Sequence, residues 1–256
     1  MIHIKTLKYT NTAGISIEAN TGKRLYCSNM DLSGVNGIFA TENYAFSHGQ
    51  VTVSRNIGAR TIPCQFIFND RCDDEAFRNK LCAVFSPLLT GTLTIETGSR
   101  LHGSTYEIDV YPAAVPVFRR DTVNYLWKFE VDFIADYPLF RKKKQQIITL
   151  TDAYTIIKSD SPIDVPLEIT FPESAVFTNY ATGAGFTLRQ HPDNKAVTVN
   201  TKDFSVIDED GNDVNHLIGM SDDISRVGLV YGDNNIFCAC GSPVVMKWYD
   251  LVLGVF

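Results

Sequence analysis

Alternation of apolar and polar residues with a period of two recurs along the whole chain and limits what it can fold into. Segments such as IHIKTLKY, GTLTIETG and WKFEVDFIAD also contain many β-branched and aromatic residues. Because successive side chains of a strand point to opposite faces, this pattern is typical of strands that bury one face. Turn-forming residues separate such segments, as in DLSGVNG at 31–37. The sequence therefore predicts a mainly β protein.

One segment, DDEAFRNKLCAVF at residues 73–85, departs from this alternation. Phe77, Leu81, Val84 and Phe85 recur at helical spacing, and Pro87 follows them. The two aspartates at its start can cap a helix and offset the positive end of its dipole. We expect one helix here, packed against a sheet.

The composition shifts near residue 140, where the basic run RKKKQQ (141–146) precedes further alternation. Single cores usually stop growing at roughly 250 to 300 residues, so a chain of this length can form two modest domains. We expect domains at residues 1–142 and 143–256, the second an all-β sandwich. The run itself is typical of a solvated linker or strand edge. An acidic partner or nucleic acid is the functional alternative.

The overall charge and hydropathy exclude some partners. The formal net charge is −6 and the pI is near 5.4, which argues against a general electrostatic grip on nucleic acid. No apolar run approaches the roughly 20 residues that a membrane span needs. We therefore expect a soluble protein, made in the cytoplasm, with no membrane contact and no specific nucleic-acid site.

Residues that could bind a metal or perform catalysis do not form recognisable motifs. The six cysteines show no framework spacing, and the histidines are scattered, so we expect free thiols, no metal site and no cofactor. The acidic segment DEDGND at 208–213 resembles the start of a calcium loop but lacks the closing glutamate. A polar hairpin turn at Asp210-Gly211 is the favoured interpretation. We expect no catalytic residues.

Two groups of residues are candidates for binding. Arg55 and Arg60 lie in the strand-like segment HGQVTVSRNIGAR, where an arginine can join two chains, face solvent or be satisfied within its own chain. Trp248, Tyr249 and Tyr180 are candidate sugar-stacking rings, although such aromatics in strands are more often core or rim residues.

The order of these elements resembles the distal tail protein family of long-tailed phages. The resemblance rests on SRN followed by Arg60, the helix segment DDEAFRNKLCAVFSP, the strand GTLTIE and the closing segment WKFEVDFIADYPLF. RVGLVYGDNNIF and VVMKWYDLVLGVF are similar to the family's C-terminal pattern of a turn and a final strand. Residues 147–211 match only in strand character. YAFSHG at 44–49 and an extra residue in Asp136-Tyr137-Pro138 depart from the pattern.

The resemblance implies an N-terminal β-sandwich domain with one helix and a C-terminal galectin-like β-sandwich domain. In the family the first assembles as a six-membered ring at the virion tail tip, with the second on its outside. The ring joins the tail tube protein to the tail-associated hub protein of the baseplate and mounts receptor-binding or fibre proteins. It has no catalytic role.

In such a ring, we expect Arg55 and Arg60 to be inter-subunit charges, with Asp73, Asp74 and Glu75 as their acceptors. The alternative function is a carbohydrate-binding module whose C-terminal domain contacts host polysaccharide. A glycoside hydrolase would need two carboxylates facing one cleft, and no motif in the sequence indicates them.

Overall fold

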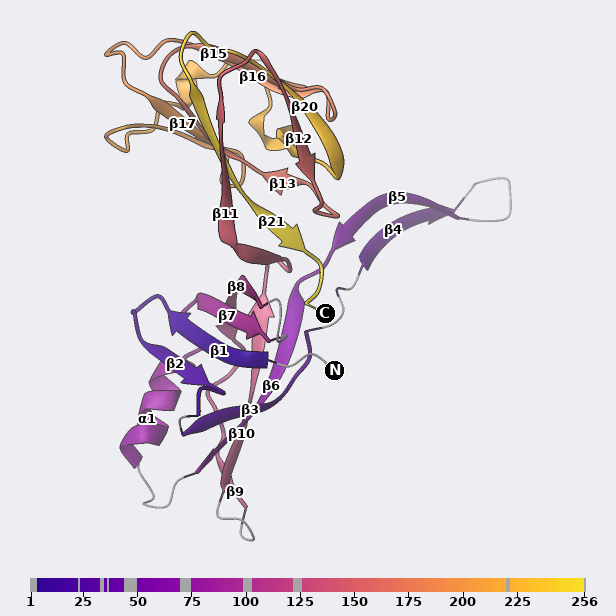
Figure 1. Ribbon diagram of the computed structural model, residues 1–256. Helices are drawn as coiled ribbons and strands as arrows, with labels where there is room; N and C mark the ends of the chain where they lie inside the picture. The colour runs from indigo at the N-terminus through magenta and orange to yellow at the C-terminus, as the bar shows by residue number, and fades with distance from the viewer. Residues whose placement is uncertain are drawn as a thin grey trace. The chain divides into compact units, whose positions relative to one another are not determined.

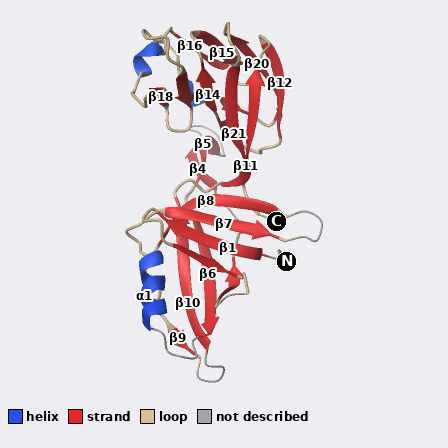
Figure 2. Ribbon diagram, turned by 60° about the vertical axis from the view of Figure 1, so that its left-hand side comes forward, coloured by secondary structure: helices blue, strands red, loops and turns tan. Residues whose placement is uncertain are grey.

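The computed structural model describes residues 4–22, 24–32, 35, 37–43, 50–69, 75–98, 103–121, 126–219 and 222–255. The chain divides into two compact units, Met1–Arg141 with Leu253–Phe256, and Lys142–Val252 (Figure 1). Strands dominate both units, and the described residues contain one α-helix, as the sequence predicted (Figure 2). No helix in these ranges is long and apolar enough to cross a membrane.

The N-terminal unit contains two antiparallel groups of strands and a separate hairpin. In the first group β1 pairs with β2 and β7, and β7 pairs with β8. In the second, β6 pairs with β3 and β10, and β10 also pairs with β9 and the end of β8. The hairpin pairs β4 with β5. The bounds are β1 Ile4–Asn11, β2 Ser16–Ala19, β3 Leu25–Met30, β4 Gly37–Asn43, β5 Gln50–Ile57, β6 Arg60–Asn69, α1 Glu75–Val84, β7 Gly91–Thr97, β8 Ser104–Pro112, β9 Arg119–Arg120 and β10 Leu126–Ala135.

Aromatic side chains from the helix end and from three strands form the core of this unit. Phe85, directly after α1, lies 5.7 Å from Tyr9 of β1 and 5.6 Å from Phe66 of β6, measured between ring centroids. It also contacts Phe129 and Phe133 of β10, at 5.9 Å each. The helix that interrupts the strand pattern thus anchors its C-terminal end in the aromatic core.

Gly91 permits the close approach of β1 and β7. A Cβ atom added there would lie 2.4 Å from the carbonyl oxygen of Thr10 and 2.7 Å from the ring of Tyr9. Burial raises the pKa of that tyrosine to about 12. A side chain at position 91 would therefore displace a backbone oxygen and a buried ring.

The C-terminal unit is a β-sandwich. One sheet has the order β18-β17-β14-β21-β11, and the other has the order β12-β20-β15-β16. Phe171 of the first sheet contacts Phe177 and Phe186 of the second, with ring centroids 6.3 and 5.7 Å apart, so the two sheets share a core. The bounds are β11 Phe140–Leu150, β12 Tyr154–Ser159, β13 Val165–Pro166, β14 Glu168–Phe171, β15 Ala175–Asn179, β16 Ala184–Leu188, β17 Val197–Asn200, β18 Ser205–Asp208, η1 Asn215–Leu217, η2 Ile224–Arg226, β19 Gly228–Leu229, β20 Gly232–Ala239 and β21 Val244–Val252.

The basic run lies within strand β11. Arg141 makes a bidentate contact with Asp109 of β8, at 2.6 and 3.0 Å, and Lys142 lies 3.3 Å from Asp250 of β21. At least two cations of the run are therefore paired with carboxylates on neighbouring strands. The run joins the two units as part of a strand.

Candidate functional site

The β4–β5 arm, residues 37–43 and 50–57, forms a two-stranded sheet of its own and leads into β6 (Figure 1). Ile38 and Phe39 expose 58% and 61% of their surface, and Ile57 exposes 39%. The ring of Phe39 covers Gly37, where an added Cβ would lie 2.8 Å from it. Isolated two-stranded ribbons are marginally stable in water, and exposed apolar patches mark interaction sites. The arm is therefore the first candidate interaction surface.

Arg55 lies on this arm. Its backbone pairs with Phe39 across the β4–β5 ladder. Its expected role as an inter-subunit charge stays a prediction.

Arg60, at the start of β6, is 3% exposed. Its guanidinium lies 4.8 Å from the ring centroid of Phe140, and its Nη2 donates a hydrogen bond to the carbonyl oxygen of Leu253. Nε and Nη1 have no hydrogen-bond partner among the described residues. Burial lowers the pKa of Arg60, while the carboxylate of Asp31 acts in the opposite direction. The guanidinium thus contacts groups of its own chain. Its role at a joint between subunits stays a prediction.

Of the three acidic candidates, Glu75 is the one that the structure describes. Glu75 is the exposed first residue of α1, and Asp73 and Asp74 lie outside the described residues. Phe77 of α1 contacts Phe68, with ring centroids 5.3 Å apart. At about 3.3 Å per residue, Phe68 lies roughly 25 Å along the strand from Arg60. An ion pair between Glu75 and Arg60 would therefore have to join two chains.

The structure does not bring the three sugar-stacking candidates together. Trp248 and Tyr249 are half-buried neighbours on β21, so their side chains point to opposite faces of that strand. Tyr180 is 55% exposed and follows β15, which belongs to the other sheet of the sandwich. A single surface containing all three rings is therefore excluded within one chain.

Tyr180 instead meets two aromatic residues that the sequence did not single out. Its ring lies 6.4 Å from those of Tyr154 and Phe237, and Tyr154 lies 5.1 Å from Phe237. Tyr154 is 61% exposed, and its ring plane is within 14° of that of Tyr180. We call Tyr154, Tyr180 and Phe237 the aromatic platform. The alternation of YTIIKS in β12 indicates that Tyr154 and Ile156 lie on the same face of the strand. It does not indicate which aromatic rings from other segments lie beside them.

The acidic segment 208–213 folds as a turn after β18. Oδ1 of Asp208 accepts hydrogen bonds from the backbone N–H groups of Asp210 and Asn212, at 3.0 and 2.8 Å, and Oδ2 accepts one from the Asn212 side chain at 2.9 Å. The Asn212 side chain is the main cause that lowers the pKa of Asp208. Gly211 has a φ of +81°, which favours glycine. The geometry agrees with the hairpin-turn interpretation.

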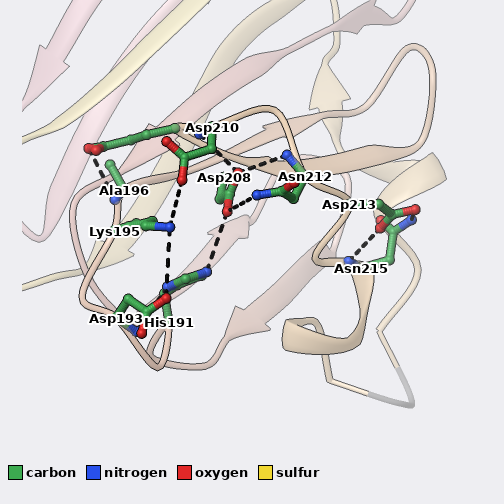
Figure 3. A network of polar contacts seen from close by, with 10 residues as sticks. His191, Asp193, Lys195, Ala196, Asp208, Asp210, Asn212, Asp213 and Asn215 are labelled. Carbon is green, nitrogen blue, oxygen red and sulfur yellow. Dashed lines mark hydrogen bonds and ion pairs between the residues drawn. The ribbon is translucent and has the colours of Figure 1, made fainter.

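A neighbouring loop is tied to this turn by polar contacts (Figure 3). Nδ1 of His191 accepts a hydrogen bond from the Asp193 backbone at 3.1 Å, and its Nε2 lies 3.7 Å from Asp208. Lys195 contacts Asp210 at 2.6 Å and Asp193 at 3.7 Å. Within the ranges that the structure describes, no group of three or more His, Cys, Asp or Glu side chains could hold a metal ion. We interpret the network as a structural connection between two loops.

The five cysteines that the structure describes are free thiols. Cys238 is buried, and burial is the main cause that raises its pKa to about 11. Cys72 lies outside the described residues. The free state of the five described thiols agrees with the expectation from the sequence.

Comparison with solved structures defines the class of fold. The chain is similar to the crystal structure of the SPP1 Dit (gp 19.1) protein, described as a paradigm of the hub adsorption apparatus in phages that infect Gram-positive bacteria. The TM-score is 0.71 at 11% identity, covering 96% of this chain and 99% of that chain. A chain of the phage P2 baseplate, in its activated conformation with calcium, matches with a TM-score of 0.52 at 10% identity and covers 98% of this chain.

The chain therefore has the fold of the SPP1 Dit distal tail protein along almost its whole length. The resemblance to distal tail proteins suggested by the sequence is confirmed at the level of the fold. No protein-family model matches the chain, and no curated protein sequence matches it.

Proposed function

We propose that this chain is a structural protein of a phage tail tip, without catalytic activity. Copies of it form a six-membered ring that joins the tail tube to the baseplate hub and mounts receptor-binding or fibre proteins. The N-terminal unit forms the ring, and the C-terminal sandwich is a galectin-like domain on its outside. The observation that carries the proposal is the fold shared with the SPP1 protein, which spans 96% of this chain and both units.

The β4–β5 arm gives the ring a physical basis. In a closed ring, each subunit meets its neighbours through two different surfaces, so one of them can be a projecting element that binds a complementary face. The apolar side chains of Ile38, Phe39 and Ile57 would be removed from water by such a contact. Burying these side chains on a neighbour would stabilise both the joint and the ribbon.

Strand edges offer a second way to join copies. An edge strand carries unpaired N–H and C=O groups that can hydrogen-bond to a strand of another chain. β3 lies at the end of the strand order in the N-terminal unit and is such an edge. Pairing there would continue the sheet from one subunit into the next.

A variant of the arm tests the proposal. The double variant Ile38→Asn/Phe39→Asn should leave the monomer folded, because both side chains are exposed, but should weaken assembly measured by light scattering. Leu88→Asn is the matched control, since Leu88 is 90% exposed outside the arm. Rings that form equally well from the arm variant would rule out the arm as the joint.

A further inference from the structure

We propose that the aromatic platform of the C-terminal unit, formed by Tyr154, Tyr180 and Phe237, is a binding site for a neutral carbohydrate. This inference goes beyond the ring-forming role and does not depend on it. It rests on three rings from three separate segments that converge on the outer face of the sheet β12-β20-β15-β16. Two of these rings are more than half exposed.

The register of the sheet defines the surface around the rings. Tyr154 of β12 pairs with Phe237 of β20, which pairs with Thr178 of β15. In the adjacent row, Ile156 of β12 pairs with Asn235 of β20, whose carbonyl oxygen accepts a hydrogen bond from the Tyr180 backbone at 3.0 Å. The side chains of these rows point away from the sandwich core. Their chain neighbours Ile157, Ile236 and Phe177 are buried, and successive side chains of a strand point to opposite faces.

Tyr180 is held in place by buried amides beneath the sheet. Asn179 and Asn234 are both 0% exposed and are joined by a hydrogen bond of 2.9 Å from Nδ2 of Asn179 to Oδ1 of Asn234. Asn179 also donates to the carbonyl oxygen of Gly228 at 2.7 Å and accepts from the backbone N–H of Ala181 at 3.0 Å. The residues on both sides of Tyr180 are thereby fixed, so its backbone position is set before any ligand binds.

The chemistry of the platform fits a sugar. A pyranose has an apolar face of C–H groups and a rim of hydroxyls, and it needs flat rings together with uncharged hydrogen-bonding groups. The rings of Tyr154 and Tyr180 supply two nearly parallel apolar faces, each with its own hydroxyl. Asn235 and Thr178 supply an amide and a further hydroxyl in the same two rows. A short neutral oligosaccharide can use all of these groups at once.

The charge distribution argues against charged polymers. The two rows contain no charged side chain, and the next outward pair along β12 and β20, Lys158 opposite Asp233, has one charge of each sign. Nucleic acids and anionic glycans are normally bound through several cations. A carbohydrate without charge is therefore the ligand class that this surface favours.

The small size of the platform favours a sugar over a protein as its ligand. A stable protein interface involves about 20 to 30 residues on each side. The exposed apolar surface consists of the platform with Ile156 at 70% and Val176 at 39% exposure, interrupted by the polar Asn235 and Thr178. This alternation of rings and polar groups is suited to a few sugar units.

The experiment measures binding of short neutral oligosaccharides of glucose, galactose and N-acetylglucosamine to the full chain by glycan array and calorimetry. The test variant is Tyr154→Ala/Tyr180→Ala, and Tyr154→Phe/Tyr180→Phe keeps the rings while removing both hydroxyls. Tyr231→Ala is the matched control, since Tyr231 is a 72% exposed tyrosine of the same unit outside the platform. Thermal unfolding of each variant verifies that it is folded.

We expect millimolar or tighter binding by the parent chain, at least about tenfold weaker binding by the double alanine variant, and little change for Tyr231→Ala. The phenylalanine variant should keep more affinity than the alanine variant, because the stacking faces remain. No binding to any of these oligosaccharides at millimolar concentration would overturn the proposal, as would equal binding by the double alanine variant. Loss of self-association in that variant without sugar binding would identify the surface as a protein interface instead.

Discussion

The guanidinium of Arg60 lies 4.8 Å from the ring centroid of Phe140 and donates a hydrogen bond to the carbonyl oxygen of Leu253. Because Arg60 is buried, Arg60→Ala should leave a void and an unpaired carbonyl, lowering the free energy of unfolding by roughly 2 to 4 kcal/mol. Arg60→Met should cost less, because it fills the space without burying the two unpartnered nitrogen atoms, Nε and Nη1. Urea unfolding of both variants measures the difference.

The same two variants separate an internal role of Arg60 from one at a subunit joint. An internal role predicts that Arg60→Met still assembles at protein concentrations where it is folded. If Arg60→Met is as stable as the parent chain but no longer assembles, Arg60 acts mainly at the joint.

Arg55→Ala is expected to weaken assembly with little effect on unfolding, if Arg55 contacts a neighbouring subunit as predicted.

The buried amide pair should show strong energetic coupling. Asn179→Ala leaves Gly228, Ala181 and Asn234 each without one hydrogen bond, so we expect a loss of roughly 3 kcal/mol in the free energy of unfolding. The double variant Asn179→Ala/Asn234→Ala should lose less free energy of unfolding than the two single variants lose together. We expect this difference to be at least about 1 kcal/mol. Additive losses in urea unfolding would contradict a shared network, and Asn235→Ala is the exposed control on the same strand.

Asp208 should contribute to the acid sensitivity of the C-terminal unit. Hydrogen bonds from Asn212 and Asp210 lower its pKa in the folded chain, whereas the unfolded value is about 3.9. Its stabilising contribution is therefore complete above that unfolded value and is lost as the pH falls through the lowered folded value. Asp208→Asn should reduce the loss of stability in this acid range and lower stability at neutral pH.

Urea unfolding of the Asp208 variant at a series of pH values from neutral to acid measures this effect. Asp233→Asn, at an exposed aspartate of β20, is the control. An acid dependence in Asp208→Asn that matches the parent chain would show that the turn is not the acid-sensitive element.

The contact between β1 and β7 requires glycine at position 91. Gly91→Ala places a methyl group against the Thr10 carbonyl oxygen and the Tyr9 ring, and we expect a loss of about 1 to 3 kcal/mol. Adding Tyr9→Leu should not restore stability, because the backbone oxygen still blocks the methyl group. A melting temperature of Gly91→Ala equal to that of the parent would contradict the close approach.

Much of the fold follows from local sequence patterns. The alternation in TIPCQFIF and WKFEVDFIAD predicts two half-buried strands, and β6 and β10 pair with each other from Arg60 opposite Ala135 to Asn69 opposite Leu126. The helix expected at 73–85 is observed as α1, Glu75–Val84. These features could be predicted because the period of the side chains is set by the backbone of each element.

The burial of Arg60 was indicated by the sequence but was not inferred from it. Arg60 has the same alternation phase as Ile62, Cys64, Phe66 and Phe68, all of which are buried. The phase therefore placed the guanidinium on the inner face. Its aromatic partner, Phe140, is distant in sequence, and only the folded chain brings the two together.

The aromatic platform could not be predicted from local patterns. Tyr154, Tyr180 and Phe237 lie on different segments that meet because β20 lies between β12 and β15. Alternation predicts which face a residue occupies, but it does not determine the order of strands in a sheet. Trp248 and Tyr249 looked equivalent to Tyr180 in the sequence, although β21 holds them half-buried in the other sheet.

The mass of the purified chain in solution, measured by light scattering over a concentration series, tests the proposed function most directly. The proposal predicts a particle of six 28.5 kDa chains, or a monomer that becomes this particle as the concentration rises. Addition of the tail tube and hub proteins provides the second condition, because neighbouring tail proteins can template a ring. A chain that remains monomeric both alone and with these proteins would contradict the ring.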